Sequence, residues 1–444
     1  MSCSKIFTGD LPEITIFIIQ YLRNDIKSLH SCILVNRHLC RVAIPILWED
    51  PFSVKCQPKN GISLLDMYFL FFNQEDKAKL RITTNLSFSP LFNYPNFIKV
   101  LNTNKVKSHI FDRVTLYSST GELQSFLTST SSIKHLNIHV DEFEASEILS
   151  DLIQSQPQLL TLSTQYSNVS LSNAAFKSYP ISLTSIKFTF CDFLNVSSFD
   201  DFKYLTQLRS LQFIYCKGIN TQFFQPLLDI STPSLEIKTL KVVGMIEGIT
   251  LLLQKIGPYL ELLELNLTNV LEKNKSFESV VDYCNKIKYL CVGNFDDGNI
   301  LQLYNMITHN KHIKYLTIGN DNARRKSNIL EGLGQILPNS LKYLILVLPI
   351  DPIHLNIFFD HCHHIDNLLI KNLNRNDIDI TFKYLKNFVK EKKGVKNLAY
   401  YVNDIFEPLI HQKLEQMACE IQPFVKMKDF YESIVDISDF EISC

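Results

Sequence analysis

One run of side chains in this sequence could bind a metal ion: His361-Cys362-His363-His364. Imidazole nitrogens and thiolate sulfurs are the ligands that Zn²⁺ prefers, and the ion would supply either a structural anchor or Lewis-acid chemistry. Neighbouring residues on one short segment cannot all converge tetrahedrally on one ion. We therefore expect no metal here, and we expect Cys362 to be a small buried residue.

Signatures of other chemistry are missing. The sequence contains no phosphate-binding glycine loop, no Gly-x-Ser-x-Gly nucleophile turn and no His-Glu-x-x-His zinc motif. Glycine makes up only 13 of the 444 residues, below the usual share of about 7 %. The formal net charge of −1 gives no general electrostatic reason to bind a polyanion. We expect no catalytic residue, no cofactor and no nucleic-acid partner.

A repeated apolar pattern organises most of the chain from about Phe111 onward. An apolar residue is followed three positions later by a second, central one, and two positions later by a third. A copy centred on Val114 opens the series, and a weaker one surrounds Leu86. The later central residues are Leu136, Leu162, Ile186, Leu211, Leu240, Leu265, Leu290, Leu316, Leu344, Leu368 and Leu398. Their spacing in the mid-twenties predicts structural repeats, each a short strand with a return segment, that stack into a parallel sheet.

Four cysteines fit the same repeat. Cys191 and Cys216 each lie five residues after a central residue, and Cys284 and Cys362 each lie six before one. The segment around Cys284 has no histidine cluster, although it occupies the position of Cys362. This comparison again favours buried, reduced cysteines over a zinc site.

The residue before each central position should face the concave side of the sheet. These residues are His135, Thr161, Ser185, Ser210, Thr239, Glu264, Tyr289, Tyr315, Tyr343, Asn367 and Asn397. Tyr289, Tyr315 and Tyr343 fall in consecutive repeats, where tyrosine offers a large contact area and a polar tip. With Thr317 and Asn266 they are our candidate substrate-binding residues. The alternative is that the stacked rings only stabilise the sheet.

The first fifty residues predict a small set of helices. Asp10 and Pro12 suit a helix start, and an apolar stripe runs from Ile14 to Leu22. Asn24-Asp25 can cap a second helix, and a third apolar group follows Arg37. So small a unit needs a partner or a neighbouring domain to complete its core.

The segment Leu11 to Phe52 resembles an F-box. The resemblance rests on Leu11-Pro12-Glu13-Ile14, Tyr21-Leu22, Asp25 to Leu29, Leu34 to Arg37 and Leu47-Trp48; a tryptophan frequent two residues after the arginine is Leu39 here. It implies docking onto the Skp-family adaptor of a cullin–RING ubiquitin ligase. The matching positions are Leu11, Pro12, Ile14, Ile18, Leu22, Leu29, Cys32, Val35 and Arg37. A generic three-helix cap on the repeat array is the alternative.

The repeats in turn resemble the cysteine-containing leucine-rich repeats that often accompany F-boxes. The expected fold is α/β: an N-terminal F-box three-helix domain followed by a leucine-rich-repeat solenoid, a curved parallel sheet with helices on the convex side. We expect the F-box in residues 1–52, irregular first repeats or a connector in 53–110, the solenoid in 111–424 and an acidic C-terminal cap in 425–444.

The expected function is that of a substrate-recognition subunit of an SCF-type (Skp–cullin–F-box) ubiquitin ligase, itself not an enzyme. The F-box would bind the Skp-family adaptor and through it a cullin, and the repeats would bind a target protein. A scaffold that binds a partner without degradation is the alternative. No signal peptide is visible and no apolar run nears the ~20 residues that span a bilayer. We expect a cytoplasmic or nuclear protein without a membrane partner.

Overall fold

The computed structural model falls into two compact units, Met1–Leu208 and Arg209–Cys444, which are described separately here. It describes residues 12–53, 64–71, 74, 77, 89–105, 132–140, 153–166, 181–196, 200–229, 235–319, 328–362, 365–374, 377–391, 395–402 and 408–429. The predicted copies centred on Leu86 and Val114, and most of the predicted acidic cap, lie outside these residues.

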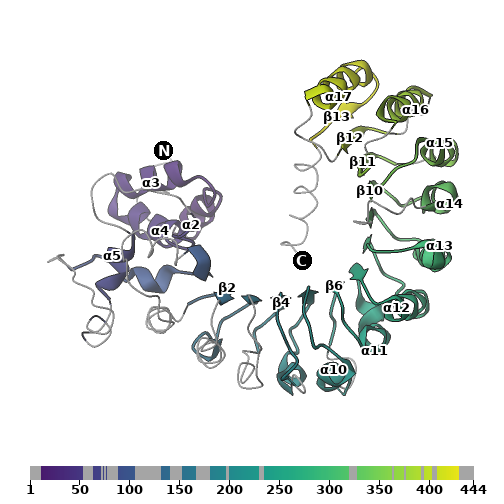
Figure 1. Ribbon diagram of the computed structural model, residues 1–444. Helices are drawn as coiled ribbons and strands as arrows, with labels where there is room; N and C mark the ends of the chain where they lie inside the picture. Colours follow the sequence, from purple (N-terminus) through teal and green to yellow (C-terminus); the bar gives the residue numbers. More distant parts are fainter. Residues whose placement is uncertain are drawn as a thin grey trace. The chain divides into compact units, whose positions relative to one another are not determined.

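The first unit begins with short helices, drawn in purple in Figure 1: α2 (Pro12–Gln20), α3 (Ile26–Val35), α4 (Arg37–Leu47) and α5 (Leu64–Phe69). The side chain of Asp25 caps α3 by accepting from the Ser28 amide, and Asn36 caps α4 by accepting from the Leu39 amide. Such caps satisfy amides that the first helical turn leaves free. They explain why α3 begins after Asp25 and α4 begins after Asn36.

The first unit continues with a parallel sheet. Its strands are β1 (Val100–Asn102), β2 (His135–Val140), β3 (Thr161–Tyr166) and β4 (Ser185–Thr189), accompanied by the 3-10 turns η1 (Tyr94–Phe97) and η3 (Asp200–Tyr204). The register aligns Leu101, Leu136, Leu162 and Ile186 in one row. All four are nearly fully buried. Since β1 pairs directly with β2, no strand separates the two.

The second unit alternates strands and helices. The strands are β5 (Ser210–Ile214), β6 (Thr239–Gly244), β7 (Leu262–Leu267), β8 (Tyr289–Val292), β9 (Tyr315–Gly319), β10 (Tyr343–Leu348), β11 (Asn367–Asn372), β12 (Asn397–Val402) and β13 (Lys426–Met427). The helices are α10 (Thr221–Leu228), α11 (Ile249–Ile256), α12 (Val270–Tyr283), α13 (Ile300–His309), α14 (Ile329–Ile336), α15 (Pro352–His361), α16 (Ile378–Glu391) and α17 (Pro408–Ile421), with 3-10 turns η4 (Gly257–Tyr259) and η5 (Asp297–Asn299). Within this unit, each strand pairs in parallel with the next.

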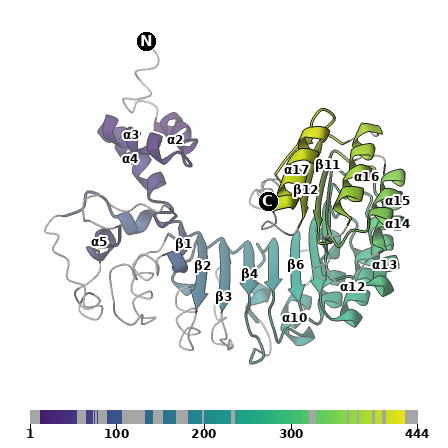
Figure 2. The same cartoon turned by 45° about the horizontal axis from the view of Figure 1, so that its top comes forward.

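The predicted α/β class with a repeated parallel sheet is confirmed. In the second unit the strands line the inner side and the helices lie outside (Figures 1 and 2). Apolar side chains alternate along the strands: in β9, Leu316 and Ile318 are fully buried while Thr317 between them is not. Each helix covers the face that these leucines and isoleucines present, which is the stacking that the repeat period predicts.

One hydrogen-bond pattern recurs at the start of several repeats. The carbonyl oxygen of Lys314 accepts from the amides of both Lys342, at 2.8 Å, and Tyr343, at 3.0 Å. The equivalent carbonyls of Lys134, Arg209, Lys238, Glu261, Lys288 and Asp366 also accept two amides from the following repeat. These paired bonds fix each strand against its neighbour and set a common register.

The register corrects one predicted central residue. Leu263, not Leu265, pairs with Leu240 on β6 and with Leu290 on β8. The sequence around β7 has apolar residues in two frames, centred on Leu263 and Leu265, and both satisfy the repeat pattern. The observed frame buries Leu263 and Leu265 completely and leaves Leu262 half-buried on the inner face.

The predicted burial of the four cysteines is confirmed. Cys191, Cys216, Cys284 and Cys362 are each at most 2 % exposed. Cys284 and Cys362 follow the last residues of α12 and α15. Burial raises the pKa of Cys284 to about 12, so its thiol stays protonated and acts as a small core residue.

Candidate partner-binding surfaces

Helices α2 and α3 expose many large apolar side chains to solvent. Phe17, Tyr21, Leu34 and Val35 are 58 %, 76 %, 74 % and 64 % exposed. We call the full set the helical apolar surface: Ile14, Ile16, Phe17, Ile18, Tyr21, Ile26, Leu34 and Val35. Single exposed apolar residues are ordinary, but such an accumulation is typical of a surface that binds another protein.

The structure divides the predicted adaptor-binding residues into two groups. Pro12, Ile14, Ile18, Val35 and Arg37 are exposed. The others face inward: Leu29 is only 1 % exposed, in a core with Ile19, Leu39 and Ala43, and Leu22 and Cys32 pack against that core. Leu11 lies outside the described residues.

Three strongly exposed residues were missing from the predicted set: Phe17, Tyr21 and Leu34. A signal for two of them was present, because Phe17 and Tyr21 continue the stripe of Ile14. The rings of Phe17 and Tyr21 also contact each other edge to face, with centroids 5.1 Å apart. Leu34 belongs to a segment that carries the F-box resemblance, but it does not fall on the apolar stripe of its own helix, which packs inward.

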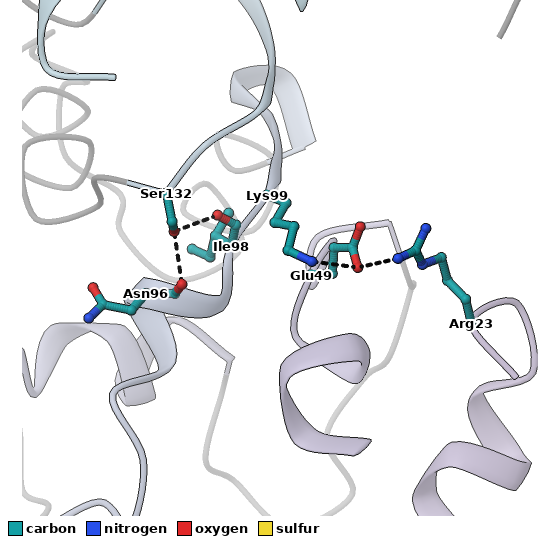
Figure 3. A network of polar contacts seen from close by, with 6 residues as sticks. All are labelled: Arg23, Glu49, Asn96, Ile98, Lys99 and Ser132. Atoms are coloured by element: carbon teal, nitrogen blue, oxygen red, sulfur yellow. Dashed lines mark hydrogen bonds and ion pairs between the residues drawn. The ribbon is translucent and has the colours of Figure 1, made fainter. Parts of the chain in front are cut away.

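Glu49 joins the helices to the sheet of the first unit (Figure 3). Its carboxylate pairs with Arg23 at 3.2 Å and with Lys99 at 3.4 Å. Its carbonyl oxygen accepts from the amides of Lys99 and Val100, the same paired arrangement that the carbonyl of Lys314 makes in a later repeat. The hydroxyl of Ser132 donates to the carbonyls of Asn96 and Ile98, both at 2.9 Å. The end of α4 therefore continues directly into the repeat ladder.

Aromatic packing reinforces this joint. The ring of Trp48 lies 4.3 Å from that of Tyr94 and 5.8 Å from that of Tyr68, between centroids. Tyr68 is fully buried, and burial raises its pKa well above the ordinary value. These ring contacts hold the end of α4 against α5 and η1.

The three predicted tyrosines do lie side by side on the inner face of the second unit. The rings of Tyr289 and Tyr315 stack with centroids 5.9 Å apart and planes at 24°. Those of Tyr315 and Tyr343 stack at 4.8 Å and 18°. Burial raises the pKa of Tyr315, and the neighbouring Tyr343 adds to the effect. We call these three residues the tyrosine stack.

Thr317 and Asn266 do not share one neighbourhood. Thr317 lies on β9, in the row next to the tyrosine stack, paired with Cys291 and Ile345. Asn266 lies two rows further along β7, because the corrected register shifts that strand by two residues. A Cβ atom at Gly293 would come within 2.7 Å of the Asn266 side chain, so this asparagine packs over Gly293. Asn266 therefore lies two residues further along its strand than the row that contains Thr317.

A row of lysines borders the tyrosine stack. Lys288, Lys314 and Lys342 each immediately precede one of the three tyrosines, and all are exposed. We call them the rim lysines. Lys288 and Lys238 both pair with Glu261, whose carboxylate lies between them. The hydrogen bond from Lys288, followed by that from Lys238, lowers the pKa of Glu261.

This lowered pKa predicts how stability depends on pH. A carboxyl whose folded pKa lies below its unfolded value stabilises the fold above the unfolded value, near 4.5, and loses this contribution as pH falls through the folded value. Glu261→Gln should lower the free energy of unfolding at neutral pH by under about 1 kcal/mol. The difference from wild type should shrink below pH 4.5 in urea titrations. A difference that stays the same from neutral to acidic pH would contradict the assignment.

No metal or membrane site is evident in the part of the chain that the structure describes. Within it, no group of histidine, cysteine and acidic side chains could hold a metal ion. His361 is exposed and Cys362 is buried, while His363 and His364 lie outside the described residues. Within the same ranges, no helix has the length and apolar character needed to cross a bilayer.

Comparisons with known proteins name no family. No family model and no curated protein matches the sequence. A solved structure of a protein from Bacteroides fragilis is similar with a TM-score of 0.32 and 10 % identity, covering 73 % of this chain and 81 % of that chain. Similarity at this level carries no argument about family or activity. A functional interpretation rests on the two surfaces described above.

Proposed function

We propose that this chain is the substrate-recognition subunit of an SCF-type ubiquitin ligase. Helices α2, α3 and α4 would form an F-box that binds a Skp-family adaptor, and the parallel repeats would be leucine-rich repeats that bind the target. The observation that carries the proposal is the helical apolar surface, with Tyr21 and Leu34 about three-quarters exposed. Water contact with this much apolar area is unfavourable, and a bound partner removes it.

The sequence resemblance supports the choice of partner. The exposed residues Pro12, Ile14, Ile18 and Val35 are among those that match the F-box pattern. Burial of Leu29 is compatible with the proposal, because a docking surface needs a small core to hold its helices in place. Ubiquitin transfer would be carried out by other subunits, so the proposal requires no catalytic side chain in this chain.

The joint at Glu49 supports a receptor over two loosely tethered domains. Ion pairs to Arg23 and Lys99, paired backbone hydrogen bonds and the ring of Trp48 hold α4 to the strands of the first unit. Strands of the first unit would thereby be held in a fixed position against the proposed adaptor-binding helices. A chain that merely tethers two partners has no need of such a connection.

Co-purification tests the proposal. The full chain, expressed together with a Skp-family adaptor, should elute with it as one complex in size-exclusion chromatography, and adding a cullin should shift that complex to larger size. Elution of the chain apart from the adaptor would contradict the proposal. A partner whose half-life lengthens when the chain is deleted would favour a receptor, and an unchanged half-life would favour a scaffold.

The tyrosine stack should matter for target capture and not for adaptor binding. Replacing Tyr289, Tyr315 and Tyr343 with serine removes a large inner contact area, so recovery of specific partners should fall by about tenfold or more. Quantitative mass spectrometry of proteins that co-purify with wild type and variant measures the change. Tyr204→Ser with Tyr283→Ser, two exposed tyrosines elsewhere, is the matched control. Unchanged recovery in the triple variant would show that the stack only stabilises the sheet.

A further inference from the structure

The tyrosine stack and the rim lysines come from a pair of residues that recurs in three consecutive repeats. The pairs are Lys288-Tyr289, Lys314-Tyr315 and Lys342-Tyr343, and a central leucine follows each of them. The register aligns the three tyrosines in one row across β8, β9 and β10. Neighbouring strands are about 4.8 Å apart, so the backbone positions of the three lysines have the same spacing. Lysines and aromatic rings therefore occupy neighbouring rows over the same three strands.

The row of the rim lysines carries a charged residue in every repeat from β5 to β12. The residues are Arg209, Lys238, Glu261, Lys288, Lys314, Lys342, Asp366 and Lys396. The carboxylate of Glu261 pairs with Lys238 and Lys288, which lie on the repeats on either side of it. That of Asp366 pairs with Lys396 at 3.0 Å. Side chains in this row therefore reach from one repeat to the next.

Lys314 and Lys342 differ from the rest of the row. Both are exposed, and among the described residues no carboxylate pairs with either ammonium group. The nearest acidic positions of the row are Glu261 and Asp366, which pair with other lysines. Like charges on adjacent strands are destabilising. An anion bound between the two ammonium groups would relieve their repulsion.

The tyrosine rings provide an apolar surface with fixed positions beside this pair of charges. The three rings are partly buried and pack against the buried residues Ile345, Leu369 and Ala399. The rings also stack on one another, with centroids 5.9 and 4.8 Å apart. Side chains held in this way lose little conformational freedom when a partner binds. The surface therefore combines unpaired positive charge with rigid aromatic contact area.

We propose that the target segment bound here is an acidic peptide. One carboxylate of the peptide lies between Lys314 and Lys342, and a neighbouring apolar side chain lies on the rings of Tyr315 and Tyr343. This peptide class rests on the proposed function, which makes the inner face the target-binding surface. Glu261 provides the precedent within the chain, because its carboxylate also pairs with two lysines. A basic peptide would add to the repulsion, which excludes it as a partner.

Selection from a phage library of random peptides on the immobilised full chain tests the peptide class without an adaptor. We expect enrichment of peptides with aspartate or glutamate next to phenylalanine, tyrosine, leucine or isoleucine. Enrichment of peptides without acidic residues would overturn the proposal, and so would a failure to enrich any peptide. When p-benzoylphenylalanine replaces the apolar residue of an enriched peptide, crosslinks should form to chain fragments that contain Tyr315 or Tyr343. Crosslinks only to the outer helices would also overturn it.

Charge reversal provides the matched comparison, measured by fluorescence polarisation with one enriched acidic peptide. Lys314→Glu with Lys342→Glu should weaken binding by about tenfold, because two attractive contacts become repulsive. Lys217→Glu with Lys275→Glu makes the same change in net charge at exposed sites outside the row and should bind as wild type does. An equal loss in both variants would contradict the proposed contacts.

Adaptor binding separates this peptide class from the proposed function. If acidic peptides bind at Lys314 and Lys342 while the chain elutes apart from a Skp-family adaptor, the peptide class is correct and only the proposed function is wrong. If the chain binds the adaptor while the enriched peptides lack acidic residues, the proposed function stands and the peptide class is wrong.

Discussion

Replacing Phe17 and Leu34 with aspartate is expected to weaken binding of a Skp-family adaptor by at least about 100-fold. Both side chains are more than half exposed, so the folded monomer loses little when they become polar. In the complex the same positions would be desolvated, and each aspartate would bring a charge into an apolar contact. Truncation of a strongly contributing interface residue alone costs about 2 kcal/mol or more, and two such changes exceed the 2.7 kcal/mol that corresponds to roughly 100-fold.

Isothermal titration calorimetry with purified chain and adaptor measures this loss. Leu271→Asp with Leu301→Asp is the matched control, since these leucines are 74 % and 72 % exposed on α12 and α13. The control pair should bind the adaptor as wild type does. Equal binding by the Phe17/Leu34 variant and wild type would mean that the helical apolar surface has another role. Circular dichroism should show the same helix content in all three proteins.

Leu29 provides a contrast within the same helices. It matches the F-box pattern, but it is nearly fully buried with Ile19 and Leu39. We therefore assign Leu29 to folding of the helical region. Loss of adaptor binding after its substitution would accompany loss of structure, whereas the aspartate variants should lose binding and keep their fold.

Asn372→Leu is expected to lower the free energy of unfolding by about 3 kcal/mol. The buried Asn372 side-chain oxygen accepts from the amides of Ile350 and Asn374, at 3.0 and 2.9 Å. Its side-chain nitrogen donates to the hydroxyl of Tyr400 at 3.1 Å. Leucine has a similar volume but satisfies none of these groups. A buried polar group left without its partner costs about 1–3 kcal/mol, and the variant affects three.

Urea unfolding followed by circular dichroism measures the effect. Asn285→Leu, at an exposed position before β8, is the control and should change stability by under about 0.5 kcal/mol. Tyr400→Phe removes only one partner of the network and should cost about 1 kcal/mol. Similar losses for Asn372→Leu and Asn285→Leu would show that the network does not stabilise this part of the array.

Much of the sheet could be predicted from the sequence, because the apolar pattern that produces each strand is short and recurs in every repeat. Each strand contributes one central apolar residue that must be buried, and the spacing between copies reveals it without a structure. The exception at β7 has a specific reason. Leu260, Leu262, Leu263, Leu265 and Leu267 satisfy the pattern in two frames, and only the hydrogen bonds to β6 and β8 choose between them.

The candidate sites were less predictable, because they depend on which face of a helix or strand packs against the core and which face is exposed to solvent. The apolar stripe on α2 could be predicted from the sequence, but its spacing does not determine whether the stripe faces the core or the solvent. Ile19 turned out to face the core, while Phe17 and Tyr21 face solvent. The tyrosine stack was predicted correctly, since its three members follow the same repeat position. The register position expected for Asn266 was shifted by two residues, because it was counted from Leu265 and not from Leu263.

The sequence by itself determined the α/β repeat class, the burial of the four cysteines and the alignment of three tyrosines. All three follow from periodicity, because residues at one phase of a repeat share one environment. Only the tertiary structure decided which apolar residues of α2 and α3 face water and how Glu49 joins α4 to the first strand. These features depend on contacts between residues far apart in the chain, and the free energy of such contacts has no local signature.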